Sequence, residues 1–238
     1  MPELPEVETT RRGLAPHVRS RRIAELLVYE PRLRWRIARE LPAQVAGQRI
    51  TSVGRRAKYL LLGLESGTLL LHLGMSGNLR AVPADTPRLT HDHFDLVLDS
   101  GLALRFNDPR RFGSLLYTRG APEEHPLLAT LGPEPLATAF DADYLFRITR
   151  RRRVAIKQLL MNSRLVVGVG NIYASEALFR ARIRQGPHVC FGAELQAAGR
   201  ARLDARRLEA LSHTVRAQRA LVDLLGRGVE LRDVERAA

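Results

Sequence analysis

The sequence predicts an α+β protein with an N-terminal antiparallel β-sandwich and a C-terminal helical domain. Short apolar or alternating runs separated by glycine-containing turns fill the first half, whereas apolar residues recur at three- and four-residue spacing in the second. A proline- and glycine-rich segment at 121–137 divides these two patterns. We therefore expect a sandwich domain at 1–120, a linker at 121–137 and a helical domain at 138–238.

One helix is expected ahead of the sandwich. Pro5 suits a first helical turn, and the carboxylates of Glu6 and Glu8 suit the positive end of the helix dipole. Gly13 is of the residue type that most often follows the end of a helix. The helix is therefore predicted to stop near Gly13.

Seven strands are predicted in the first half. Glycine-containing turns at 65–67 and 99–101 join two pairs of them as hairpins. The predicted strands are Leu26–Tyr29, Ile50–Gly54, Tyr59–Leu64, Thr68–Leu73, His93–Leu98, Leu102–Phe106 and Ser114–Thr118. Consecutive short strands of this kind indicate an antiparallel sandwich or barrel.

Four helices are predicted in the second half. They are Tyr144–Thr149, Val154–Met161, Ile172–Ala181 and Leu203–Leu225. Residues 166–171 form a glycine-punctuated connection between two of them, which is typical of a helix–turn–helix device whose backbone N–H groups face phosphate. No strand-then-helix unit surrounds the Gly-x-Gly of this connection, so a dinucleotide-binding loop is disfavoured.

The charge of the chain indicates a polyanionic partner. The 238 residues carry 38 Lys and Arg against 25 Asp and Glu, a net charge of +13. Such a basic protein attracts nucleic acid first and anionic membrane second. All but two of the basic residues are arginine, the exceptions being Lys58 and Lys157. Codon bias of a GC-rich genome and the fit of guanidinium to phosphate both account for this excess of arginine.

Several protein classes are disfavoured by composition. No apolar run is long enough to span a bilayer, and the N-terminus lacks the pattern of a signal peptide. Cys190 is the only cysteine, which excludes a disulfide framework or a cysteine-rich zinc site formed by this chain. We expect the reducing environment of a cytoplasm.

The residues that follow Met1 predict nucleophilic chemistry. If Met1 is removed, Pro2 becomes an N-terminal secondary amine with a pKa of about 8, so a fraction of it is uncharged near neutral pH. Such an amine can attack the aldehyde carbon of a sugar and form a cationic iminium. Glu3 can transfer a proton at the sugar, and Glu6 can hold the amine or a water. The alternative is that this segment is only a capped helix.

Six ordered motifs resemble those of the bacterial formamidopyrimidine-DNA glycosylase family, which removes 8-oxoguanine and ring-opened purines. They are Pro2–Thr9, Arg55–Leu60, His72–Gly77, His91–His93, Asn107–Gly113 and Leu165–Glu176, and they span nearly the whole chain. The last resembles the family's helix–two-turn–helix. The sister family that removes oxidised pyrimidines tends to have glycine where this chain has Leu4, which favours the purine enzyme.

The resemblance implies the catalytic roles. Pro2 would displace the damaged base and hold the sugar as an iminium, and Glu3 would be the acid that helps to open the ribose ring. Lys58 would be the proton donor for β-elimination at the abasic site. The alternative for Lys58 is a solvated charge at the edge of a strand.

The resemblance also implies which residues contact DNA. Extruding a base leaves a gap in the stack, and Met75, Arg110 and Phe112 match the wedge that fills it. Taken alone, Met75 and Phe112 would be expected in the core. His91, Arg110, Arg152 and Asn171 match contacts to duplex DNA. His91 and His93 could also form a metal pair, but no third ligand is apparent and we predict no metal. No role is predicted for Lys157.

The resemblance departs at the C-terminal end. The family ordinarily ends in a four-cysteine zinc finger, which is expected to begin where this chain reaches Ala238. In residues 227–233, Val229 and Glu230 replace the small hydroxyl residues of the segment that covers extruded 8-oxoguanine. We therefore expect no cofactor within these residues. Two alternatives stay open: a catalytically impaired binder of damaged duplex DNA, and a glycosylase for oxidised pyrimidines.

Overall fold

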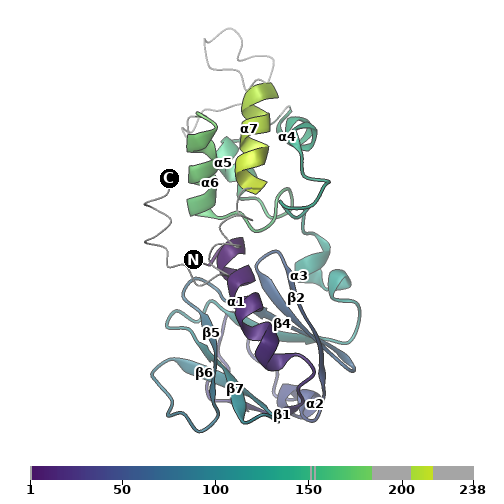
Figure 1. Ribbon diagram of the computed structural model, residues 1–238, viewed down its shortest axis with the longest axis vertical. Coiled ribbons are helices and arrows are strands. Elements are labelled where there is room, and N and C mark those ends of the chain that lie inside the picture. Colours follow the sequence, from purple (N-terminus) through teal and green to yellow (C-terminus); the bar gives the residue numbers. More distant parts are fainter. Residues whose placement is uncertain (1, 151, 153, 184–204, 217–238) are drawn as a thin grey trace. The chain divides into compact units, whose positions relative to one another are not determined.

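The computed structural model describes residues 2–150, 152, 154–183 and 205–216 (Figure 1). The chain divides into two compact units, Met1–Ala129 and Thr130–Ala238, and the division falls within the proline- and glycine-rich segment. Cys190, the segment 227–233 and the ends of the predicted helix Leu203–Leu225 lie outside the described residues. No helix in the described part of the chain has the length and hydropathy needed to cross a membrane.

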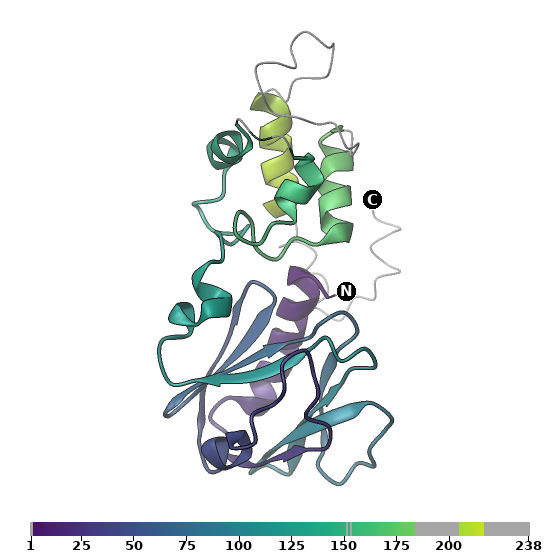
Figure 2. The same cartoon turned by 180° about the vertical axis from the view of Figure 1, so that it is seen from behind.

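The first unit is an antiparallel β-sandwich with one long helix, as predicted. One sheet has the strand order β1-β6-β7-β5 and the other β2-β3-β4-β8. The strands are β1 Ile23–Val28, β2 Ile50–Arg56, β3 Tyr59–Leu64, β4 Gly67–His72, β5 Asn78–Pro83, β6 Asp92–Leu98, β7 Leu102–Asn107 and β8 Ser114–Thr118. Side chains from both sheets form one hydrophobic core, and helix α1 (Leu4–Val18) packs on β2, β3 and β5 (Figures 1 and 2).

The prediction that the first helix stops at Gly13 is wrong. Helix α1 continues to Val18, because Leu14 and Val18 extend the apolar face that begins with Leu4 and Val7, and all four side chains are buried. The free energy gained by burying those side chains exceeds the roughly 1 kcal/mol that glycine costs inside a helix.

Strand β5 and the short helix α2 (Leu41–Val45) were not predicted. In β5 only Leu79 is buried, so the strand lacks the alternating apolar pattern that identifies a half-buried strand. Backbone pairing with β7 holds this strand in the sheet instead. The pairs run from Asn78 with Asn107 to Pro83 with Leu102.

The second unit is helical, as predicted. Its helices are α4 Ala142–Thr149, α5 Ile156–Leu160, α6 Asn171–Arg180 and α7 Ala205–Arg216, and a 3-10 turn η1 Pro122–Glu124 and helix α3 Pro126–Ala129 precede them in the first unit. Helix α7 packs on α4 and α6, with Leu211 and Val215 buried in the core of this unit. The connection into α6 is buried at Val166, Val167 and Val169.

Candidate active site

The start of α1 fixes the predicted nucleophile and acid. Glu3 is the N-cap residue of α1, and its backbone N–H donates to Oε2 of Glu6 at 2.9 Å, as part of a reciprocal capping box. Leu4 and Pro5 are buried and anchor this first turn. Glu3 is only 1 % exposed, whereas Pro2 is partly exposed. A solvent-accessible proline therefore precedes a buried carboxyl group whose backbone is held by Glu6.

Lys58 lies in the two-residue turn between β2 and β3, where Arg56 pairs with Tyr59. The preceding residue, Ala57, has a φ of +52° in the left-handed region, a conformation that costs a residue with a Cβ roughly 1–2 kcal/mol. Burial lowers the pKa of the Lys58 ammonium, and the carboxylates of Glu3 and Glu6 act in the opposite direction. The fold thus brings Lys58 within electrostatic reach of both glutamates.

A cluster of charged residues ties α1 to the Lys58 turn. Glu8 accepts hydrogen bonds from Arg11 at 2.6 Å, from Arg12 at 3.0 Å and from Arg55 at 3.1 Å. Burial raises the pKa of Glu8, but the hydrogen bonds from these guanidinium groups outweigh it and lower the pKa to about 2. Nη1 of Arg55 also donates to the carbonyl oxygen of Ala57 at 2.8 Å. Arg55 therefore joins the helix that carries Glu3 to the turn that carries Lys58.

His72, at the end of β4, is a neutral neighbour of Lys58. Its Nδ1 accepts the backbone N–H of Gly74 at 2.9 Å, so the ring proton lies on Nε2, and the ring packs on Tyr59 with centroids 4.8 Å apart. Burial lowers the pKa of His72 to about 4, and the positive charges of Lys58 and Arg34 contribute. The imidazole is thus uncharged at neutral pH.

Met75 and Phe112 are exposed, and neither belongs to the buried core. Met75 is 38 % exposed and Phe112 is 43 % exposed, and the guanidinium of Arg110 lies over the Phe112 ring at 5.0 Å. Their two loops approach each other closely at Gly74, where an added Cβ would lie 2.5 Å from the backbone nitrogen of Gly113. The three residues of the predicted wedge therefore lie on two loops that pack together.

His91 is exposed in a loop next to this pair. Its φ of +71° is left-handed, and its carbonyl oxygen accepts the backbone N–H of Asp108 at 3.0 Å. His93 is buried instead, and its Nε2 donates to the carbonyl oxygen of Asp108 at 2.7 Å. The two histidines thus have different environments. In the part of the chain that the structure describes, no group of three or more His, Cys, Asp or Glu is arranged to hold a metal ion.

The other predicted DNA contacts belong to the second unit. Asn171 is the first residue of α6, after the N-cap Gly170, and its side chain is exposed. Arg152 is also exposed, and the neighbouring Arg150 lies over the ring of Phe146 at 3.7 Å. These side chains are therefore available to a ligand of the second unit.

Two family models cover most of the chain. Residues 1–115 match the formamidopyrimidine-DNA glycosylase N-terminal domain, and residues 131–222 match the formamidopyrimidine-DNA glycosylase H2TH domain. The chain belongs to the formamidopyrimidine-DNA glycosylase family.

Relatives and solved structures agree with this assignment. The formamidopyrimidine-DNA glycosylase of Thioalkalivibrio sulfidiphilus is 63% identical over 186 residues, which are 78% of this chain and 69% of the relative. The structure of MutM (Fpg) from Thermus thermophilus matches 94% of this chain and 77% of its own, with 38% identity and a TM-score of 0.76. The Lactococcus lactis enzyme bound non-covalently to DNA with an AP site matches 95% and 84%, with 28% identity and a TM-score of 0.82.

Within this family fold, sequence reasoning gave no role to Arg55, His72 or Asp108. All three occur in motifs that carry the resemblance, so their position in those motifs was the available signal. Their contacts are with residues distant in sequence or with backbone atoms, which composition and spacing do not reveal. The structure shows them beside Lys58, Met75 and Arg110.

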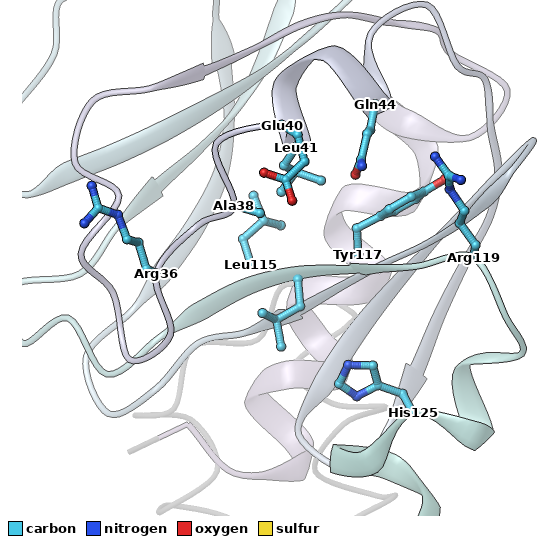
Figure 3. Close-up of a pocket in the computed structure, with 10 residues that line it drawn as sticks. Arg36, Ala38, Glu40, Leu41, Gln44, Leu115, Tyr117, Arg119 and His125 are labelled. Carbon is cyan, nitrogen blue, oxygen red and sulfur yellow. The ribbon is translucent and has the colours of Figure 1, made fainter.

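A separate pocket of about 320 Å³ lies beside β8 (Figure 3). In the close-up, Arg36 lies across the pocket from Arg119 and His125. Its lining comes from Arg36, Ala38, Glu40, Leu41, Gln44, Leu115, Leu116, Tyr117, Arg119 and His125. None of the predicted catalytic or DNA-contacting residues is among them.

Proposed function

We propose that this glycosylase of base-excision repair removes oxidised purines, namely 8-oxoguanine and formamidopyrimidines, from duplex DNA and then cleaves the strand at the abasic site. The observation that carries the proposal is the juxtaposition at the start of α1. A partly exposed Pro2 precedes the buried Glu3, and Lys58 is within electrostatic reach of Glu3 and Glu6. In a member of this family, this arrangement supports Pro2 as the nucleophile, Glu3 as the acid and Lys58 as a second proton donor.

The chemistry begins at Pro2 once Met1 has been removed. The proline nitrogen attacks C1′ of the damaged nucleotide, so that a C–N bond forms and the glycosidic bond breaks. The base leaves with its bonding electron pair and takes up a proton. Glu3 protonates the sugar ring oxygen, and ring opening gives a cationic iminium on Pro2.

Strand cleavage follows because the iminium is an electron sink. Loss of a proton from C2′ sends electrons toward the iminium, and the bond from C3′ to its phosphate oxygen then breaks in a β-elimination. We assign the proton transfers of this step to Lys58, because burial lowers the pKa of its ammonium and so makes it a better proton donor. We propose that this second activity makes the protein an AP lyase as well as a glycosylase.

Both units supply contacts to the DNA in this proposal. Met75, Arg110 and Phe112 fill the gap that base extrusion leaves, and His91 contacts the duplex beside them. In the second unit, Arg152 and Asn171 contact phosphates. We propose that the protein acts as a monomer in the bacterial cytoplasm.

The scheme uses only the amino terminus and side chains of this chain. The family's zinc finger requires four cysteines, and these 238 residues contain one. The residues present therefore do not fit that zinc site, and no step of the reaction is assigned to a metal.

The proposal is tested by trapping the iminium. The protein is incubated with a duplex that contains 8-oxoguanine in the presence of borohydride, and the mass of the N-terminal peptide is read. We expect a DNA adduct on Pro2, with none from the same duplex carrying guanine. A folded protein that has lost Met1 and binds the 8-oxoguanine duplex without forming the adduct would contradict the proposal and favour a non-catalytic binder. An adduct formed only with an oxidised pyrimidine would reassign the lesion class.

A further inference from the structure

Asp108 is a buried carboxylate that joins two exposed loops. It follows the last residue of β7 and is 0 % exposed. Its Oδ1 accepts a hydrogen bond from the Ser76 hydroxyl at 2.5 Å and from the backbone N–H of Arg110 at 3.2 Å. Its Oδ2 accepts the backbone N–H of Gly113 at 2.8 Å. One carboxylate therefore bonds to both loops of the predicted wedge.

The backbone of Asp108 holds a third loop, which carries His91. Its N–H donates to the carbonyl oxygen of His91 at 3.0 Å, and its carbonyl oxygen accepts Nε2 of His93 and the backbone N–H of Arg111, at 2.7 and 3.2 Å. Three segments that are far apart in sequence thus meet at one residue.

These loops need such an anchor because two of their apolar side chains, Met75 and Phe112, lie outside the hydrophobic core. Each is more than a third exposed, so its burial holds the loops less firmly than that of a core side chain would. Arg111 has a left-handed φ of +57°, a conformation that in a residue with a Cβ persists only where the surrounding structure imposes it. Hydrogen bonds to an ionised acceptor are stronger than those between neutral groups, which suits a carboxylate to this task.

We propose that Asp108 is the positioning residue of the wedge, and that it makes Met75, Arg110 and Phe112 enter the DNA as one unit. This inference rests on the proposed function, because the wedge acts only when a base is extruded from duplex DNA. Asp108 touches no reacting atom. It acts through the loops that it joins.

The variant Asp108→Asn tests the inference without changing the size of the side chain. In either orientation, the NH2 group of the asparagine amide faces a donor group whose hydrogen bond the carboxylate accepted. Ser76→Ala removes one of the three hydrogen bonds to the Asp108 carboxylate, together with the bond that Ser76 Oγ accepts from the backbone N–H of Arg110 at 3.3 Å. It is the deciding variant if Asp108→Asn does not fold. Asp95→Asn is the matched control, because Asp95 is equally buried in the same unit but bonds to Tyr29 and Arg105.

Two substrates separate wedge positioning from general stability. An abasic site in single-stranded DNA needs no base extrusion, whereas 8-oxoguanine in a duplex does. We expect Asp108→Asn to lose about tenfold or more in excision from the duplex, while cleavage of the single-stranded abasic site stays within about threefold of the unsubstituted protein. Equal losses on both substrates, or no loss on the duplex, would overturn the inference.

A fluorescence measurement keeps the test independent of catalysis. The duplex carries a stable abasic analogue with 2-aminopurine opposite, so insertion of the wedge changes the stacking of the fluorophore. We expect Asp108→Asn to lose most of the fluorescence change on binding, Ser76→Ala to lose part of it, and Asp95→Asn to keep it. If the unsubstituted protein gives the change but no excision, the proposed function fails and the inference stands. The inference would be wrong if folded Asp108→Asn gave the full fluorescence change on binding. Where Asp108→Asn does not fold, a full fluorescence change from Ser76→Ala would contradict it.

Discussion

Gly74 is constrained in two independent ways. Its φ of +69° lies in the left-handed region, and a Cβ there would lie 2.5 Å from the backbone nitrogen of Gly113. Backbone atoms move less easily than the end of a flexible side chain. Gly74→Ala must therefore push apart the two loops that carry Met75 and Phe112. Gly101 has a similar φ of +79°, but an added Cβ there meets nothing within 4 Å.

Comparing the alanine variants of Gly74 and Gly101 distinguishes the cost of a steric clash from the cost of backbone strain. We expect Gly101→Ala to lower the free energy of unfolding by roughly 1–2 kcal/mol, the cost of a left-handed alanine, and Gly74→Ala to lower it by at least about 2 kcal/mol more. Urea denaturation of both variants measures the difference. Equal losses would show that the loops relax around the added methyl group.

At the scale of elements, the Glu8 cluster joins α1 to strand β2 and to the turn that follows it. Because the folded pKa of Glu8 is about 2 and its usual value is 4.5, its charge stabilises the fold above pH 4.5, and this contribution is lost as pH falls through 2. We expect Glu8→Gln to lower the free energy of unfolding by about 1–2 kcal/mol at pH 7, a figure reduced for solvent screening.

The difference between Glu8→Gln and the unsubstituted protein should shrink as pH falls from 4.5 toward 2, which denaturation at pH 7, 4 and 2.5 would show. Glu30→Gln is the control. Glu30 also has a pKa lowered to about 2, by hydrogen bonds from Arg32, but its ion pair is solvent-exposed and contributes little to stability. An undiminished difference at pH 2.5 would contradict the assignment of the effect to the charge of Glu8.

The elements that the sequence predicts well are those whose signals are local. The strand pairs around 65–67 and 99–101 have apolar runs on both sides of a turn, and the structure contains them as β3 with β4 and β6 with β7. The length of α1 was mispredicted because the burial of Leu14 and Val18 depends on the sheets beneath them. The bond between Ser76 and Asp108 spans 32 residues, and no local pattern encodes it.

At the scale of the whole molecule, the net charge of +13 is spread over two units that both carry predicted DNA contacts. Each basic side chain that neutralises a phosphate releases bound counterions, which makes binding weaken as salt concentration rises. Residues 130–238, which form the second unit, contain 19 basic and 11 acidic groups, so this unit supplies most of the excess. The dependence of affinity on salt is therefore a measure of how many of these groups touch the DNA backbone.

Arg152 is the predicted phosphate contact that this measurement can isolate. We expect Arg152→Ala to weaken binding to lesion-containing and undamaged duplexes alike, and to reduce the slope of log affinity against log salt concentration by about 1. Arg119→Ala is the matched control, because Arg119 is also exposed but lines the pocket beside β8. Titrations from low to moderate salt give both slopes. If the two variants change the slope equally, the +13 charge acts as a diffuse field and Arg152 makes no phosphate contact of its own.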